Sequence, residues 1–221
     1  MPEPTTVHAE DMNLSQAGKI AHLDAKGVSY QLFSLLLSYP DDSHFISALT
    51  MARDWVQQFL LENPGVTMDA LLGALDTLSA KTDEELAVEY VSTFDFREST
   101  SLYLTAHELG DSRSRGPAMV ALRNMLHHYG YEEATAELPD FLPALFEFLS
   151  ELSPDERPFD LEQRVAKVCR EINSHLPPDS HYKPVFEVMT EILPEVPADA
   201  NPFPLREKAD TDELPYPLLY D

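Results

Sequence analysis

The sequence predicts an all-α protein, a single compact helical domain of about eight or nine helices with flexible N- and C-terminal tails. Two observations support this fold class. Almost every apolar segment repeats at helical spacing, and no stretch shows the sustained apolar–polar alternation of a half-buried strand. We expect residues 1–23 to form a flexible N-terminal segment, 24–193 the helical domain, and 194–221 an acidic, proline-rich tail.

Eight apolar stripes predict the helices in order. They lie in residues 28–39, 45–60, 71–78, 86–94, 115–129, 138–152, 161–172 and 185–192. Pro40 stops the first stripe, because proline lacks an amide proton and clashes with the preceding turn. Thr67 can cap the third helix. Thr82 and Glu85 match a capping box for the fourth, in which each side chain accepts a hydrogen bond from the other residue's amide.

Residues 95–116 are less regular and carry charges of both signs. A short helix can cover 102–109. The residues expected to structure the following loop are Gly110, Asp111, Arg113, Arg115 and Gly116. Because arginine binds carboxylates in a fixed geometry, we expect Arg113 or Arg115 to tie this segment internally rather than to bind phosphate. The candidate carboxylate partners are Asp95, Asp111 and Asp140.

The predicted 138–152 helix places acidic residues beside aromatic ones. Asp140, Ala144, Glu147 and Glu151 fall on one stripe, with Phe141, Leu145, Phe148 and Leu152 beside it. A core face next to a solvated face would explain this pattern for most amphipathic helices. However, residues 135–163 contain eight carboxylates against one arginine. A basic, partly apolar peptide could place its cations on the acidic stripe and its apolar groups in the adjacent groove.

The composition restricts the partners and the compartment. A net charge of −24 repels nucleic acid and anionic membranes and attracts basic partners, although it also serves solubility. Cys169 is the only cysteine and lies in phase with a helical stripe, so we expect a core residue. No signal peptide is evident, and the longest aliphatic run, 35–37, is too short to span a bilayer. We therefore expect a cytoplasmic protein without membrane insertion.

The C-terminal tail has one unexpected feature, an apolar cluster at 214–220 after a strongly acidic stretch. Two hypotheses follow: the cluster docks back over an apolar groove, or the tail is unstructured. The sequence favours the unstructured tail, because ordering each residue costs roughly 1–2 kcal/mol in backbone entropy.

Residue sets for bond chemistry are weakly represented, and we expect no cofactor. His107-Glu108 begins like a zinc-protease motif, but Asp111 stands where the second histidine belongs. The glycines form no phosphate-binding loop, and no serine sits in a nucleophile elbow. The carboxylates of Asp140 and Glu147, two turns apart on the predicted helix, leave an acidic helical hydrolase as an alternative.

Several short motifs together resemble the NarJ family, the delta-subunit chaperones of respiratory nitrate reductase within the TorD-like molybdoenzyme chaperones. They are Tyr90-Val91 with Thr93-Phe94-Asp95, Ser101-Leu102-Tyr103-Leu104, Gly110-Asp111 with Arg113, Arg115 and Gly116, and Glu137-Leu138-Pro139-Asp140 with Leu142-Pro143 and Glu147-Phe148. Relatives often carry histidine after the aspartate of the last motif, where this chain has Phe141. Any proton-dependent role of that histidine therefore does not transfer.

The resemblance implies a cytoplasmic chaperone and not an enzyme. It would bind the N-terminal segment of the catalytic alpha subunit of nitrate reductase until molybdenum cofactor and iron–sulfur centres are in place. Proteins that deliver molybdenum cofactor are further candidate partners. The acidic-Pro-Asp element of the family's peptide-binding region corresponds to Glu137, Pro139 and Asp140. An alternative is a chaperone for another molybdoenzyme or exported reductase.

The residues that we expect to bind the peptide come from the motifs and from the predicted helix beside them. They are Tyr90, Phe94, Asp95, Leu102, Tyr103, Glu137, Pro139, Asp140, Phe141, Leu145, Glu147 and Phe148.

Overall fold

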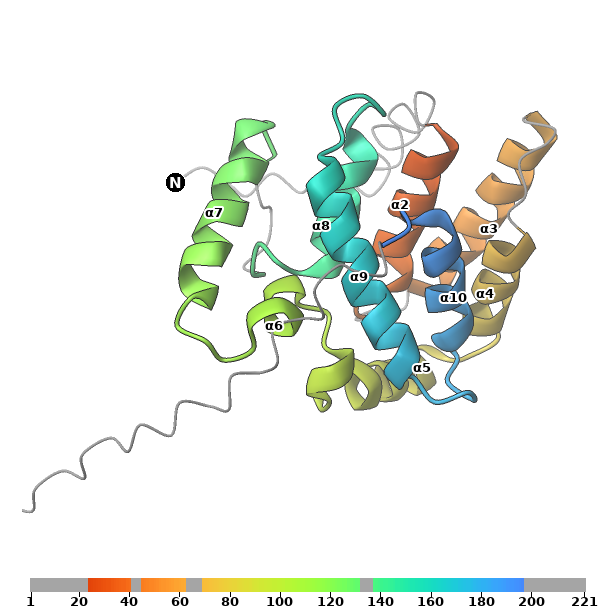
Figure 1. The fold of residues 1–221 in the computed structure, drawn as a ribbon. Helices are drawn as coiled ribbons and strands as arrows, with labels where there is room; N and C mark the ends of the chain where they lie inside the picture. The colour runs from red at the N-terminus through yellow and green to blue at the C-terminus, as the bar shows by residue number, and fades with distance from the viewer. Residues whose placement is uncertain (1–23, 41–44, 63–68, 132–136, 197–221) are drawn as a thin grey trace, which may run out of the picture.

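The computed structural model describes residues 24–40, 45–62, 69–131 and 137–196. Within these residues the chain forms nine α-helices and no strand, which confirms the predicted fold class (Figure 1). The helices are α2 (Ala25–Leu36), α3 (Phe45–Glu62), α4 (Asp69–Ser79), α5 (Asp83–Tyr90), α6 (Leu104–Leu109), α7 (Arg115–His128), α8 (Leu142–Glu151), α9 (Phe159–His175) and α10 (Lys183–Ile192). A π-helical turn, η1 (Val91–Asp95), continues α5, and a 3-10 turn, η2 (Glu98–Thr100), follows. The expected Thr67 cap lies outside the described residues.

Local sequence signals account for several helix ends. The predicted capping box is present at α5: Glu85 donates its amide to Thr82 Oγ1 at 3.2 Å, and Thr82 donates its amide to Glu85 Oε2 at 2.9 Å. Helix α2 is capped by Asp24, whose carboxylate accepts the Gly27 amide at 3.0 Å. The first stripe was predicted too long, because α2 ends at Leu36 and Tyr39 is half-exposed.

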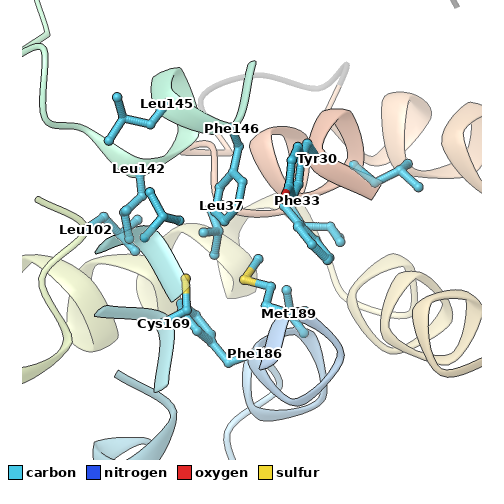
Figure 2. Close-up of a cluster of buried hydrophobic side chains, with 14 of the residues drawn as sticks. Tyr30, Phe33, Leu37, Leu102, Leu142, Leu145, Phe146, Cys169, Phe186 and Met189 are labelled. Atoms are coloured by element: carbon cyan, nitrogen blue, oxygen red, sulfur yellow. The ribbon is translucent and has the colours of Figure 1, made fainter. Parts of the chain in front are cut away.

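The core forms where α2, α8, α9 and α10 pack together, with α3 and α4 against one side (Figure 1). Aromatic rings from α2 and α8 meet there, and the Phe33 and Phe146 centroids lie 5.4 Å apart. Figure 2 labels ten of the buried side chains: Tyr30, Phe33, Leu37, Leu102, Leu142, Leu145, Phe146, Cys169, Phe186 and Met189. Cys169 is fully buried, as predicted, and burial raises the pKa of its thiol.

Buried polar residues join helices that are distant in sequence. Arg157 is 8% exposed, donates to the Leu149 carbonyl at 3.0 Å, and pairs with the Asp24 carboxylate. Its guanidinium lies 5.5 Å from the centre of the Tyr30 ring, a cation–π distance. Tyr30 in turn donates a hydrogen bond to the buried Glu162. Such groups require partners, since an unpaired buried charge is costly.

The predicted 138–152 helix begins four residues late, at Leu142. Pro143 lies in its first turn, where proline is tolerated, while Pro139 and Asp140 lie in the turn before the helix. Asp140 and Glu147 therefore do not share a helix face, and this expectation was wrong. The consequence is that Asp140 can point into the protein instead of along an exposed stripe.

None of the described helices is long and apolar enough to cross a membrane.

Candidate functional site

The candidate site forms where the turn before α8 crosses the entry to α6. Tyr103 and Phe141 make an isolated antiparallel bridge. Two backbone hydrogen bonds of 2.8 Å flank it: Leu104 donates its amide to the Asp140 carbonyl, and Leu142 donates to the Leu102 carbonyl. Two motifs that the sequence separates are thereby fixed side by side, because paired backbone groups hold both segments in register.

Asp140 anchors this crossing from inside the protein. Its side chain is fully buried, and Oδ2 accepts hydrogen bonds from the Thr105 amide at 3.1 Å and from the Thr105 hydroxyl. Tyr103, the residue at the N-cap position of α6, makes no capping hydrogen bond through its side chain. The Asp140 carboxylate thus takes the place of a local cap and satisfies an amide that the first helical turn leaves unpaired.

Arg115, at the start of α7, completes the same network. Its Nε donates to Thr105 Oγ1 at 3.1 Å, and its Nη2 lies 3.6 Å from Asp140 Oδ2. Of the internal pairs that the sequence left open, the structure contains this one. The network connects α6, α7 and the turn before α8. It therefore fixes both ends of the loop between α6 and α7.

We call the network of Asp140, Thr105 and Arg115 the anchor. Three partly or fully exposed side chains belong to the same crossing, and we call them the rim: Tyr103, Glu137 and Phe141. The Tyr103 and Phe141 ring centroids are 5.4 Å apart, and the Tyr103 hydroxyl donates to Glu137 Oε2 at 3.1 Å. Burial of the ring, followed by the negative charge of Glu137, raises the pKa of Tyr103 to about 12. The rim therefore presents two aromatic rings beside a carboxylate.

A second acidic–aromatic group lies on α8 and the end of α7. Glu147 is exposed and accepts a hydrogen bond from the Tyr131 hydroxyl at 3.0 Å. The rings of Tyr129 and Tyr131 each lie 5.6 Å from the ring of Phe148, which is buried. Tyr131 was not expected from the sequence, since it lies outside the motifs and no spacing rule links it to Glu147.

The structure divides the expected peptide-binding residues into two groups. The accessible ones are Asp95, Tyr103, Glu137, Phe141 and Glu147. The buried ones are Tyr90, Phe94, Leu102, Pro139, Asp140, Leu145 and Phe148. In this conformation the buried side chains cannot contact a ligand, because they expose no area to solvent. They contribute instead to the packing that holds the accessible residues in place.

The expected loop residues also differ in their placement. Gly110 ends α6 with a φ of 57°, a conformation that favours glycine. Asp111 and Arg113 are exposed in the turn that follows. Gly116 lies inside α7 rather than in the loop. The role of Thr105 was not predicted. A signal was present, because a short helix without a capping side chain leaves a first-turn amide that needs an acceptor from elsewhere in the chain.

The described part of the chain contains no group of three or more His, Cys, Asp and Glu residues placed to hold a metal ion. The ring of His107 is already used in the fold, since its Nε2 lies 2.7 Å from the Ser101 carbonyl oxygen. Its neighbour Glu108 forms a two-pronged ion pair with Arg164 of α9, with both N–O distances 2.7 Å. These two residues thus join α6 to the rest of the bundle.

Comparison with known proteins supports the resemblance. The profile of the nitrate reductase delta subunit family matches residues 61–178. A Bacillus subtilis protein named a probable nitrate reductase molybdenum cofactor assembly chaperone, NarJ, is 30% identical over 172 residues, which cover 76% of this chain and 90% of that protein. The chain belongs to the nitrate reductase delta subunit family.

One further relative and one solved structure are also similar to this chain. The Escherichia coli K12 nitrate reductase molybdenum cofactor assembly chaperone NarJ is 31% identical over 165 residues, covering 73% of this chain and 67% of that protein. A crystal structure of a putative redox enzyme maturation protein from Archaeoglobus fulgidus has a TM-score of 0.52 at 20% identity. The match covers 86% of this chain and 98% of that one. That likeness shows the fold.

Membership of the delta subunit family decides between the functional classes. Its relatives bear the names of assembly chaperones, and the chain is a chaperone rather than an enzyme. The hydrolase alternative is therefore wrong. The geometry agrees, because Asp140 is fully buried while Glu147 is exposed on α8, and a catalytic pair needs both carboxyl groups at the substrate.

Proposed function

We propose that this protein is a cytoplasmic chaperone dedicated to respiratory nitrate reductase. It binds the N-terminal segment of the catalytic alpha subunit and keeps that subunit competent for molybdenum cofactor insertion and for assembly with its partner subunits. The family and the names of its relatives support the nitrate reductase client. Proteins that deliver molybdenum cofactor remain candidate partners on the same grounds.

The rim is the observation that carries the peptide-binding part of this proposal. Tyr103 and Phe141 provide flat apolar area at a low cost in side-chain entropy, and Glu137 provides a charge beside them. A peptide that alternates basic and apolar residues can place an aliphatic or aromatic side chain against the rings and a cation on Glu137. Glu147, on α8, would accept a second cation from the same peptide.

The anchor beneath the rim makes this surface selective. Because Asp140 and Arg115 hold the crossing from inside, the rim residues are positioned before the peptide arrives. A positioned surface loses little conformational entropy on binding, which favours one peptide over other basic chains. The net charge of −24 adds a long-range attraction that speeds the encounter without specifying the sequence.

Titration calorimetry tests peptide capture. A peptide that copies about fifteen residues from the start of the cognate alpha subunit should bind near micromolar, about 8 kcal/mol. Full-length alpha subunit should compete with the peptide. Absence of heat together with absence of competition would remove the peptide-binding part of the proposal.

A pull-down from nitrate-respiring cells tests the identity of the client. The large subunit recovered with the chaperone should be the nitrate reductase alpha subunit. Recovery of a different molybdoenzyme in its place would reassign the client while leaving the chaperone role intact. A matched pull-down with a rim variant, Tyr103→Ala with Phe141→Ala, should lose that subunit.

A further inference from the structure

Helix α7 and the turn before it form a basic stretch in an acidic chain. Residues 112–131 contain three arginines and two histidines and no aspartate or glutamate. The whole chain has 39 acidic residues in 221, so an average stretch of this length would carry about three or four of them. A uniformly acidic surface that serves solubility therefore does not describe this segment.

The cations of this stretch are also more exposed than those elsewhere. The described residues contain twelve of the fifteen lysines and arginines, and three of these twelve are exposed: Arg97, Arg113 and Arg123. Arg97 lies between two exposed acidic residues, Asp95 and Glu98. Arg123 has no acidic residue within eight positions on either side. Two of the three exposed arginines thus lie at α7, and one of them is far in sequence from any carboxylate.

One face of α7 combines these charges with apolar area. Val120, Arg123 and His127 follow one another at three- and four-residue spacing, which places them on the same side of the helix. All three are exposed, and Val120 is 56% exposed. The buried residues of the helix are Leu122 and Leu126. We call Val120, Arg123 and His127, with Arg113 in the turn before the helix, the α7 face.

The start of α7 adds to the positive potential. Acidic side chains are favourable in the first turn of a helix, but α7 has none there and begins with Arg115. Ser114 at the N-cap position makes no capping hydrogen bond through its side chain. Arg115 binds inward to the anchor, whereas Arg113 is exposed in the preceding turn. The exposed arginines are therefore not the one that holds the candidate site together.

We propose that the α7 face is a docking surface for an acidic segment of a protein partner, in which an apolar side chain lies between carboxylates. Arg123 and His127 can donate hydrogen bonds to carboxylates, and Val120 offers apolar contact beside them. Figure 1 shows α7 at one edge of the described part of the molecule, so its outer side is open to a partner. The inference does not depend on the proposed function, because positive charge would repel the basic peptide expected at the rim.

The other simple occupants fit this surface less well. Nucleic acid and anionic membranes are repelled by the net charge of −24. A second copy of the chain carries the same net charge. The chain's own tail, residues 197–221, has six acidic residues against two basic ones, but ordering it would cost roughly 1–2 kcal/mol of backbone entropy for each residue. A separate acidic protein segment meets neither difficulty if it is already folded.

Fluorescence anisotropy on the full chain tests the proposal with a labelled acidic helical peptide. The peptide has one leucine with glutamates one turn before and one turn after it, and a neutral version has glutamine in place of each glutamate. The acidic peptide should bind at low ionic strength and lose affinity as salt is added, because salt screens exposed charges. The neutral peptide should bind about tenfold more weakly. Equal affinities of the two peptides would overturn the proposal.

Two single variants test the α7 face itself. Arg123→Gln removes an exposed charge and Val120→Ser an exposed apolar contact, and each should weaken binding of the acidic peptide by about threefold. Arg97→Gln is the matched control, because it removes the exposed arginine that lies outside this stretch. It should leave binding unchanged. Equal weakening by Arg123→Gln and Arg97→Gln would contradict the proposal, since binding would then follow net charge alone.

Three further outcomes would assign the α7 face to another occupant and so overturn the proposal. The first is tighter binding of the acidic peptide after truncation at Val196, seen only when Arg123 is present, which would assign the face to the tail. The second is self-association of the unmodified chain that Arg123→Gln abolishes. The third is displacement of the labelled peptide by a short DNA duplex at a lower concentration than by the unlabelled peptide.

Discussion

The backbone amide of Thr105 donates a hydrogen bond of 3.1 Å to the carboxylate of Asp140, a residue 35 positions further along the chain. Helix α6 is thus capped from a distance, by the turn that precedes α8. The same carboxylate meets Arg115 at the start of α7. One buried side chain therefore determines how three segments of the candidate site lie relative to one another.

Asp140→Asn should lower stability. Asparagine keeps the shape and an acceptor for the Thr105 amide, but it removes the charge that Arg115 and the Thr105 hydroxyl contact. We expect the free energy of unfolding to fall by roughly 1–3 kcal/mol, as for hydrogen bonds to a buried charge. Urea denaturation measures this change.

Asp111→Asn is the matched control for that variant, since Asp111 is exposed in the turn after α6. It should leave the urea midpoint unchanged. If Asp140→Asn instead kept full stability and lost affinity for the alpha-subunit peptide, Asp140 would contact the ligand directly, and the conformation that binds would differ from this one.

Glu137→Gln should weaken binding of the alpha-subunit peptide without changing stability. Glu137 is exposed at the rim and accepts a hydrogen bond from the Tyr103 hydroxyl. The neutral amide oxygen of glutamine can still accept that hydrogen bond. Loss of one exposed charge should reduce affinity by about two- to fivefold, or 0.4–1 kcal/mol. Calorimetry compares it with Glu191→Gln, which removes an exposed carboxylate from α10. Equal affinities for the two variants would count against the rim.

Asp24 should make stability depend on acid. Burial alone would raise the pKa of Asp24, but the hydrogen bonds from Arg157 and from the Gly27 amide, with the Arg157 charge, hold it below its ordinary 3.8. A carboxyl with a lowered folded-state pKa contributes stability that is present above its unfolded-state pKa. That contribution is lost as the pH falls through the folded-state value.

Asp24→Asn isolates this effect, because asparagine can still cap α2 but cannot pair as a charge with Arg157. The unmodified chain should be more stable than the variant near neutral pH. The difference should shrink as the pH falls below about 4. Urea midpoints across that range measure it, with Asp54→Asn, at an exposed position of α3, as the control. A difference that stays constant with pH would contradict this assignment.

Association with the client should depend on ionic strength. If the net charge of −24 attracts the alpha-subunit peptide, added salt should slow association while dissociation changes less. Stopped-flow fluorescence measures both rates. Association rates that ignore salt between low and physiological strength would mean that the acidic surface serves solubility alone.

Two truncations should separate the end of the domain from the tail. Arg170 Nη2 donates to the Pro194 carbonyl at 2.9 Å, and Val196 packs against the core. Truncation after Leu193 removes both contacts and should lower the free energy of unfolding by about 1 kcal/mol or more. Truncation after Val196 should leave the melting temperature and client affinity unchanged. Tighter client binding by the chain truncated after Val196 would instead support a tail that shields the peptide-binding surface.

The amino-acid sequence by itself determined the all-α class and most helix positions, because both depend on local interactions. Apolar spacing reflects which face of a helix is buried, and the Thr82–Glu85 capping box lies within one turn. The same locality explains why Cys169 was correctly assigned to the core from its phase in a helical stripe. The motifs of the candidate site were also visible, since they are short and contiguous.

Only the tertiary structure decided which of the motif residues face outward. The predicted acidic stripe assumed that Asp140 continued the helix of Glu147, whereas the chain turns before Leu142 and buries Asp140 beneath α6. The contacts that cause this turn join residues far apart in the sequence: Leu142 to Leu102, and Asp140 to Thr105 and Arg115. Helical periodicity indicates only which face of a segment is buried, and it treats the interior as uniformly apolar. It cannot reveal a buried polar group whose partners lie on other helices, because the stability of that group depends on hydrogen bonds that exist only after the chain has folded.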